Sequence, residues 1–499
     1  MSITPGRAVA LKLTALAVIL MPSENPVFAS AEFEDALQNP DTSSTLALSL
    51  SPQSQIGFST SSFGKIKPAL SGSATIKVHT PTTKVDIAME YARLQAPGAD
   101  ALFAAGYDRI LLEDGTGARR HRLRASVQVS PSIRFTAGRD TLHDGYGLRS
   151  LFRGGHTAPA PFAQTEIDGG RIAYRHRIEA LSASSPRPIQ FSAGDPYRSS
   201  IERLAVSQRV TLRIGHRLEF ALWGAVVWPI DGGSGRWFEP HYLVPIAALR
   251  PTEYAQGSSD NAMVGGEFRL DLAPAGDIAR RHATGPVISI LPAPPRYLYG
   301  QFILDELLLA HLMAGDSWWG NQWGLLGGLH WGLRRGHIQA ELSAVRPYTY
   351  AHSSGAQSWV QGETPVAHPL GAHFVEAQFE LEQRRQAWTL TALVSGSLRG
   401  EQGSQPINGD DDRISETATW FEGKTRALAF GWLELGHALT WGERGEIATL
   451  FAAVTARQVT HRIGGIEGPF GRPLDVPRES TATIMIGLRM GTPLRSPNW

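Results

Sequence analysis

The sequence predicts an all-β fold, a transmembrane antiparallel β-barrel of about 16–18 strands. The first observation is an alternation of apolar and polar residues in segments near ten residues, long enough for a tilted strand to cross a bilayer. The second is a composition with 52 Gly and 32 Pro, typical of turn-rich β structure. The third is a mean hydropathy of −0.15, too low for a bundle of apolar helices. The chain has no cysteine, which excludes disulfide scaffolds and cysteine-ligated metal sites.

The N-terminus predicts export. Arg7 and Lys12 precede an apolar stretch, Leu13–Met21, that is too short to span a bilayer, and small residues occupy positions 29–31. We therefore expect a signal peptide cleaved near Ala31, with an N-terminal membrane anchor or a buried helix as the alternative. Cleavage removes two basic residues and one acidic residue from a chain of net charge +1, so the mature chain is neutral. A neutral chain has no electrostatic case for binding nucleic acid.

The rest of the chain is expected to form one domain. Its 499 residues would suggest about three soluble domains, but no linker separates them. A closed barrel accounts for this length, because closure leaves no strand edge exposed. The expected organisation is a signal peptide (1–31), a short periplasmic lead segment (32–44) and an outer-membrane barrel (45–499).

The alternating segments indicate strands with one apolar and one charged face. In Lys84–Leu94, Val85, Ile87, Met89 and Tyr91 share one face. Similar alternation occurs in Val210–Leu222, where the opposite face carries Arg213, Arg217 and Glu219, and in Thr481–Met490. A soluble β-sandwich would also alternate, but charges are costly in a dry core and acceptable in a wet lumen.

Aromatic residues and glycine clusters mark the predicted strand ends. We expect turns at residues 232–235, 408–410 and 464–465. We expect aromatic girdles at the two membrane interfaces. Their candidate members are Trp223, Trp228, Trp237, Trp318, Trp319, Trp323, Trp331, Tyr348 and Tyr350.

The segment Gly138–Phe152 is the densest in charge and glycine. It is predicted to be a tightly turning loop. One interpretation is a polar constriction inside the lumen, with Arg139 and Arg149 facing Asp140 or Asp144. The other is a salt-bridge network that only holds an inward loop in place.

Several motifs together resemble one family. They are GRDTLHDGYGLRSLF from Gly138, RPTEYAQGSSDNA from Arg250, YGQFILDE from Tyr299, WWGN from Trp318, RPYTYAH from Arg346 and AHPLGAHF from Ala367. In this order they resemble the capsule-assembly Wzi family of outer-membrane β-barrels, most closely the branch with gliding-motility-associated relatives. The resemblance covers Gly138–Phe374, about half of the chain.

The resemblance implies a bacterial outer-membrane barrel of about eighteen strands that binds, assembles or attaches surface polysaccharide such as capsule or exopolysaccharide, and that is not an enzyme. The alternative function is a porin-like or polysaccharide export channel. The expected partners are outer-membrane lipid and lipopolysaccharide, surface polysaccharide and the outer-membrane insertion machinery, for which Trp499 is a suitable end. The periplasmic helical segment of better-known members is expected to be missing.

The candidate binding residues combine rings, which stack on sugar faces, with polar groups, which bond sugar hydroxyls. A purely architectural role within the lumen is the alternative. The candidates are Arg139, Asp144, Arg149, Glu253, Asp260, Asn261, Gln301, Asp305, Glu306, Arg346, Tyr348, Tyr350 and His368.

No catalytic residue, metal ligand or cofactor is predicted. A glycosidase needs two carboxylates that converge about 5–9.5 Å apart, which the adjacent Asp305 and Glu306 do not provide by themselves. His352, His368 and His373 match no metal-ligand motif, so we expect them to form hydrogen bonds within the lumen.

Overall fold

The structure is a computed structural model. It describes residues 45–59, 67–79, 82–94, 108–112, 115–184, 200–230, 239–243, 260–272, 296–306, 308–333, 335–352, 355–362, 364–404, 416–421, 424–441, 446–467 and 473–490. The predicted signal peptide and lead segment therefore lie outside the described residues, as do Glu253, Trp237 and the end of the chain after Met490.

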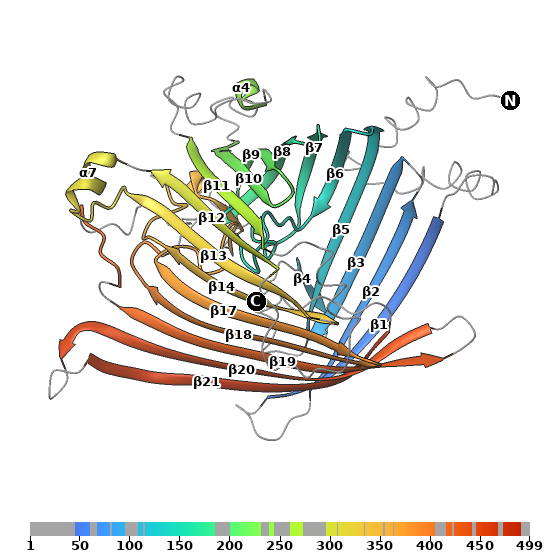
Figure 1. The fold of residues 1–499 in the computed structure, drawn as a ribbon. Coiled ribbons are helices and arrows are strands. Elements are labelled where there is room, and N and C mark those ends of the chain that lie inside the picture. Colours follow the sequence, from blue (N-terminus) through green and yellow to red (C-terminus); the bar gives the residue numbers. More distant parts are fainter. Residues whose placement is uncertain are drawn as a thin grey trace, which may run out of the picture.

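The described strands form one closed antiparallel barrel (Figure 1). The main sheet has 19 strands, and β4 pairs only with β5, so that 18 strands form the ring. Neighbours follow in chain order, and β1 pairs with β21 to close it. The strands are β1 (Thr45–Ser59), β2 (Lys67–His79), β3 (Thr83–Leu94), β4 (Asp108–Leu112), β5 (Gly115–Ser130), β6 (Ile133–Asp140), β7 (Ala160–Asp168), β8 (Ile172–Ser184), β9 (Ser200–Ile214), β10 (Leu218–Pro229), β11 (Asn261–Asp271), β12 (Tyr297–Glu306), β13 (Gln322–Leu333), β14 (Gly336–Val345), β17 (Phe374–Arg385), β18 (Trp388–Gly400), β19 (Thr425–Trp441), β20 (Glu446–Glu467) and β21 (Pro473–Met490).

The remaining described elements are short. They are the helices α4 (Pro240–Leu243), α7 (Leu309–Ala314) and η2 (Gly355–Gln357), and a small hairpin of β15 (Val360–Gln361) and β16 (Thr364–Pro365). Within the described parts of the chain, no helix has the length and apolar character needed to cross a membrane.

The alternation located strands well and turns less well. Lys84–Leu94 lies in β3 and Thr481–Met490 lies in β21, as predicted. Val210–Leu222, however, is a hairpin, because β9 ends at Ile214 and β10 begins at Leu218. These two residues pair directly, so the alternation keeps its phase across the turn and resembles one strand.

The predicted turn at residues 464–465 is also wrong, because both glycines lie within β20. A strand interior tolerates glycine at some cost in conformational entropy, so a glycine pair alone does not define a turn. The other two predicted turns lie outside the described residues.

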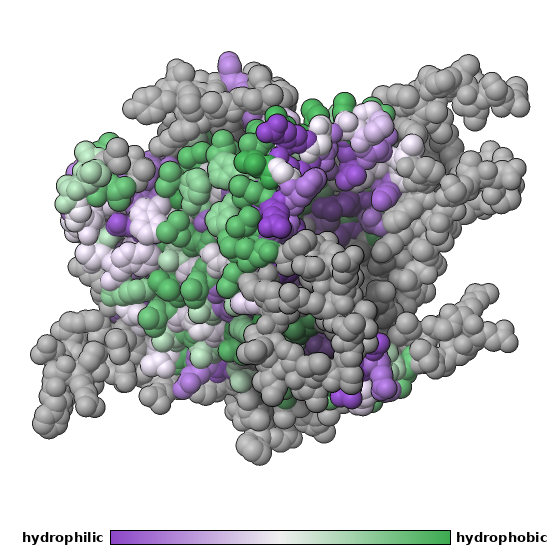
Figure 2. Space-filling view, viewed as in Figure 1, coloured by the Kyte–Doolittle hydropathy of each residue, from purple (hydrophilic) through white to green (hydrophobic). Residues whose placement is uncertain are grey.

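The wall has an apolar outer face and a charged inner face. On the outside, Leu222, Leu325 and Leu342 are 53%, 53% and 64% exposed, and hydrophobic residues gather over β10–β12 in Figure 2. On the inside, Arg177 and Glu341 are buried. This arrangement inverts that of a soluble protein and is typical of a barrel whose outer face meets lipid. The predicted transmembrane β-barrel is confirmed.

The two ends of the barrel differ. Because consecutive strands are antiparallel, their connections alternate between the ends. One end carries short turns, such as those of β5–β6, β7–β8 and β13–β14, and is called the short-turn end. The other, the long-loop end, carries two loops that enter the lumen: residues 141–159 (the first inward loop) and residues 346–373 (the second inward loop).

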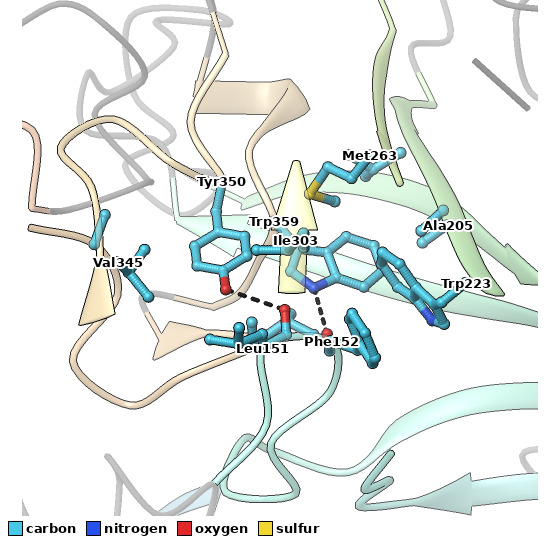
Figure 3. Packing of buried hydrophobic residues seen from close by; sticks show 14 of the residues in the cluster. Leu151, Phe152, Ala205, Trp223, Met263, Ile303, Val345, Tyr350 and Trp359 are labelled. Carbon is cyan, nitrogen blue, oxygen red and sulfur yellow. Dashed lines mark hydrogen bonds between the residues drawn. The ribbon is translucent and has the colours of Figure 1, made fainter. Parts of the chain in front are cut away.

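The inward loops pack on the wall through an apolar cluster (Figure 3). Phe152 of the first loop stacks on Trp223 of β10 with ring centroids 4.7 Å apart. Trp359 of the second loop meets Trp223 edge-on and donates its indole N–H to the Phe152 carbonyl at 2.8 Å. Tyr350 donates its hydroxyl to the Leu151 carbonyl at 3.0 Å. The loops thus form a single packed body inside the barrel.

This packing corrects part of the aromatic-girdle prediction. Trp223, Tyr348 and Tyr350 are buried inside the barrel, and Trp228 is buried against Tyr242. Trp223 shares the inward face of β10 with Glu219, at an even spacing along the strand. Position near a strand end indicates a girdle only when the residue also faces outward.

Candidate functional site

Asp144 fixes the first inward loop to β8. Its carboxylate accepts two bonds from Arg177, at 2.9 and 3.0 Å, and lies 2.7 Å from Arg175. Burial alone would raise the pKa of Asp144, but the guanidiniums of Arg175 and Arg177 hold this pKa below its ordinary value of 3.8. The carboxylate therefore stays ionised at neutral pH.

A second buried charge pair lies beside the first. Arg153 of the first loop contacts Glu179 of β8 at 3.0 Å, and Arg177 lies 3.5 Å from the same carboxylate. Arg153 also donates to the Thr157 hydroxyl at 2.5 Å. Acids and bases thus alternate through the buried contact between loop and wall, so each buried charge faces an opposite one.

Backbone groups of the first loop bind polar side chains of the wall. Glu341 of β14 accepts the amide protons of Leu148 and Arg149 at 2.9 and 3.0 Å. It also accepts the hydroxyl of Tyr299 at 2.9 Å. Gln301 of β12 accepts the amide proton of Leu151 at 2.8 Å. These bonds satisfy backbone donors that would otherwise be buried without partners.

The second inward loop is held in the same way. Arg203 of β9 donates to the Ser358 carbonyl at 2.5 Å and to the Val360 carbonyl. Asp305 of β12 accepts the amide proton of Tyr350 at 2.7 Å. Tyr350 has a left-handed φ of +73°. Such a conformation in a tyrosine persists only when its surroundings fix it, and the bonds at both ends of this residue do so.

One cluster joins both loops to β17. Glu376 lies 3.5 Å from the guanidinium of Arg149 and 3.1 Å from Nε2 of His368. Burial lowers the pKa of His368, and the Glu376 carboxylate opposes that shift. Ser343 Oγ also lies 3.3 Å from His368 Nε2. In a catalytic triad the serine and the carboxylate bind different ring nitrogens. Here both face Nε2 in a buried position, so the geometry is that of a structural contact.

The predicted site residues divide into two groups. Asp144, Arg149, Gln301, Tyr350 and His368 converge in the contact between the loops and the wall, together with Asp305. The other described candidates lie around it. Arg139 donates to the Pro159 carbonyl, and Arg346 donates to the Ala418 carbonyl near the buried Tyr348. Asp260 accepts a hydrogen bond from Tyr242, Asn261 is buried at the start of β11, and Glu306 is partly exposed.

The predicted pairing within Gly138–Phe152 is wrong. Asp140 pairs with Arg124 of β5 at 3.3 Å, Asp144 with β8 and Arg149 with β17. A loop that crosses a lumen directs successive side chains to different parts of the wall. Partners distant in the sequence are therefore the rule in this segment.

Sequence reasoning missed the wall residues that receive the loops. The main ones are Arg177, Glu179, Arg203, Glu341 and Glu376. Each is a buried charge on the inward face of an alternating strand. A charge at an inward position in an otherwise apolar segment was the available signal, and it required knowledge of the strand register.

A polar cavity of about 280 Å³ lies toward the short-turn end. Charges of both signs line it, including Arg134, Arg175, Arg209, Arg213, Glu166, Asp168 and Glu219. The arginines all have acidic partners: Arg213, for example, lies 2.8 Å from Asp168. The cavity is a charged space lined by residues of β5 to β10 near their short turns.

Three histidines were singled out by sequence, and each has a hydrogen-bond partner. His352 contacts Gln357 Oε1 at 3.0 Å, and His373 contacts the Gln402 carbonyl at 2.6 Å. His368 contacts Glu376 and Ser343 through Nε2. No group of three or more potential metal ligands occurs among the residues that the structure describes.

Comparisons with known proteins give fold-level likeness only. No family model and no curated protein matches the chain. Among solved structures, it is similar to Wzi of Escherichia coli, an outer membrane protein involved in group 1 capsule assembly and a carbohydrate-binding β-barrel (TM-score 0.47, 11% identity, covering 93% of this chain and 88% of that chain). It is also similar to the Pseudomonas aeruginosa outer membrane proteins OpdK (TM-score 0.44, 10% identity, 89% and 98%) and OccK2, solved with glucuronate (0.43, 10%, 89% and 98%). At these identities and TM-scores, the likeness assigns neither a family nor a ligand to this chain.

Proposed function

We propose that this protein is an outer-membrane β-barrel whose lumen is closed by the two inward loops and whose long-loop end binds surface polysaccharide. The observation that carries the proposal is the set of buried ion pairs that fix both loops to the wall, above all Asp144 with Arg175 and Arg177. Loops held by buried charges suit a rigid binding surface better than a conducting path, because breaking a buried pair is strongly unfavourable.

The long-loop end carries chemistry suited to sugars. Trp319 is partly exposed there, beside the exposed carboxylate of Glu416. Trp319 donates its indole N–H to Glu416 at 3.0 Å and meets Tyr348 of the second inward loop edge-on. Rings and carboxylates held in a fixed relation can stack on a sugar face and accept its hydroxyl protons. The sequence resemblance to the Wzi family supports the same ligand class.

Glycan-array binding of the purified protein tests this proposal. We expect binding to a bacterial surface polysaccharide, weakened in Trp319→Ala and retained in Trp388→Ala, a partly exposed tryptophan at the short-turn end. Deletion of the gene should also reduce surface-polysaccharide staining. Unchanged staining together with an absence of glycan binding would overturn the proposal.

A channel function is the second candidate, and the cavity of about 280 Å³ inside the barrel favours it. Planar-bilayer conductance distinguishes the two. Large steady currents from the unmodified protein would support a channel and contradict a closed lumen.

The remaining proposals follow from the export pattern and the site chemistry. The mature chain begins near Ala31, and residues 32–44 precede the barrel in the periplasm. The long-loop end faces outward from the cell, as is usual for barrels with short periplasmic turns. The protein acts by binding and carries out no catalysis.

A further inference from the structure

Helix α7 exposes an apolar surface at the margin of the long-loop end. Leu308, Leu312 and Met313 are 47%, 45% and 80% exposed. Figure 1 shows α7 at the outer edge of the barrel, beyond β12 and β13. Neither of the hydrophobic clusters found among the described residues includes a residue of this helix. An apolar surface that the protein itself does not cover indicates an interaction.

The loop around α7 is braced, so this exposure is built into the fold. At its base, Asn321 Oδ1 accepts the amide proton of Leu308 at 2.9 Å. On its far side, the amide of Trp319 donates to the Glu416 carbonyl at 3.1 Å, and the amide of Ala418 donates to the Ser317 carbonyl at 2.9 Å. These bonds tie the α7 loop to the β18–β19 loop and hold the helix away from the core.

His311, the polar side chain of the helix, contacts other residues of the same loop. His311 stacks on Trp318 with ring centroids 4.6 Å apart, and its Nδ1 lies 2.5 Å from Asp316 Oδ2. Gly315 ends the helix with a left-handed φ of +66°. The polar groups thus serve the loop itself, and leucine and methionine remain as the exposed chemistry.

The exposed surface continues the lipid-facing wall. Leu325 and Trp323 share the outward face of β13, and Trp323 lies one alternation nearer to the long-loop end. The ring centroids of Trp323 and Trp420 lie 6.2 Å apart, so two tryptophans lie together where β13 begins. Tryptophan is enriched at the membrane–water boundary. The chain from α7 enters β13 at this boundary.

We propose that α7 is a lipid-contacting rim helix: its Leu312 and Met313 side chains, and that of Leu308 directly before it, lie among the acyl chains of the outer leaflet. Continuity with the lipid-facing wall carries this assignment. The helix extends the hydrophobic wall locally beyond its tryptophans and anchors the loop that carries Trp319. The inference rests on the barrel fold and, for the choice of leaflet, on the proposed outward orientation of the long-loop end, and it goes beyond polysaccharide binding.

The absence of cysteine from the chain allows a clean labelling test. Three full-length variants, Met313→Cys, Leu325→Cys and Lys424→Cys, are labelled with a polarity-sensitive fluorophore and folded into phosphatidylcholine vesicles that contain acyl-chain quenchers. Leu325 is the lipid-facing reference, and Lys424, whose side chain is 64% exposed in the β18–β19 loop, is the aqueous reference.

We expect the label at residue 313 to be blue-shifted and quenched to the same extent as the label at residue 325, while the label at residue 424 is quenched only by aqueous iodide. A label at residue 313 that matches the one at residue 424 would overturn the proposal. Protection from both quenchers would also overturn it, since a second copy or another protein would then cover the helix. Heat-shifted gel mobility of all three variants confirms that they are folded.

Discussion

Asp144→Asn is expected to release the first inward loop from β8. The substitution keeps the side-chain volume but removes the charge that faces the buried Arg177 and the partly buried Arg175, so both guanidiniums lose a close anionic partner. Removal of one partner of a buried ion pair costs ~3–5 kcal/mol. Since 1.36 kcal/mol corresponds to a tenfold change in an equilibrium constant, the population with the loop detached should rise at least about a hundredfold.

Hydrogen exchange measures this population. The amides of Leu148 and Arg149 donate to Glu341 of β14 at 2.9 and 3.0 Å, so their protection reports contact between the loop and the wall. The matched control is Asp168→Asn, which removes a carboxylate from a 2.8 Å pair with Arg213 that is largely exposed. An exposed pair contributes ~0–1 kcal/mol, so the control should change little. Equal protection of residues 141–159 in the two variants would refute the argument that buried charges hold the loop.

Three further predictions concern the same body of loops. Trp359→Ala should lower the free energy of unfolding by ~3–5 kcal/mol, whereas Trp359→Phe, which loses chiefly the bond to the Phe152 carbonyl, should cost only ~1 kcal/mol; thermal unfolding separates them. Burial and the neighbouring charges lower the pKa of His156 to about 3, so between about pH 6.5 and pH 3 the imidazole is protonated in the unfolded chain but not in the folded one. The melting temperature should therefore fall as the pH drops below 6.5, and it should fall less steeply in His156→Gln. Gly145→Ala should displace the first inward loop, because φ is +109° and a Cβ would lie 2.0 Å from Gln301 Nε2; unchanged hydrogen-exchange protection would contradict this.

The sequence predicted the wall of the barrel because alternation is a local property. The outward Val, Ile, Leu and Phe and the inward Arg and Glu follow from a period of two, and no distant contact is needed to recognise them. Both interpretations of Gly138–Phe152 placed it inside the lumen, on the strength of its glycines and charges, and the first gave it a polar constriction. Its buried ion pairs also fit the second, a salt-bridge network that holds the loop.

The partners of the loop residues were beyond local reasoning. Asp144 pairs with Arg177, 33 residues away in the sequence, and Arg149 pairs with Glu376, 227 residues away. Such pairs depend on strand register and on the path of the loop across the lumen. Trp223 was assigned to a girdle from its place near a strand end, although its even spacing from Glu219 puts it on the charged, inward face of β10.

The conductance of the unmodified protein in planar bilayers tests the central claim most directly, namely that the two inward loops close the lumen. If the buried ion pairs hold both loops in place, the reconstituted barrel should show no large steady current, and Asp144→Asn should add brief openings. A large steady current from the unmodified protein, with the loops still protected from hydrogen exchange, would show that a path exists beside them and would contradict the account.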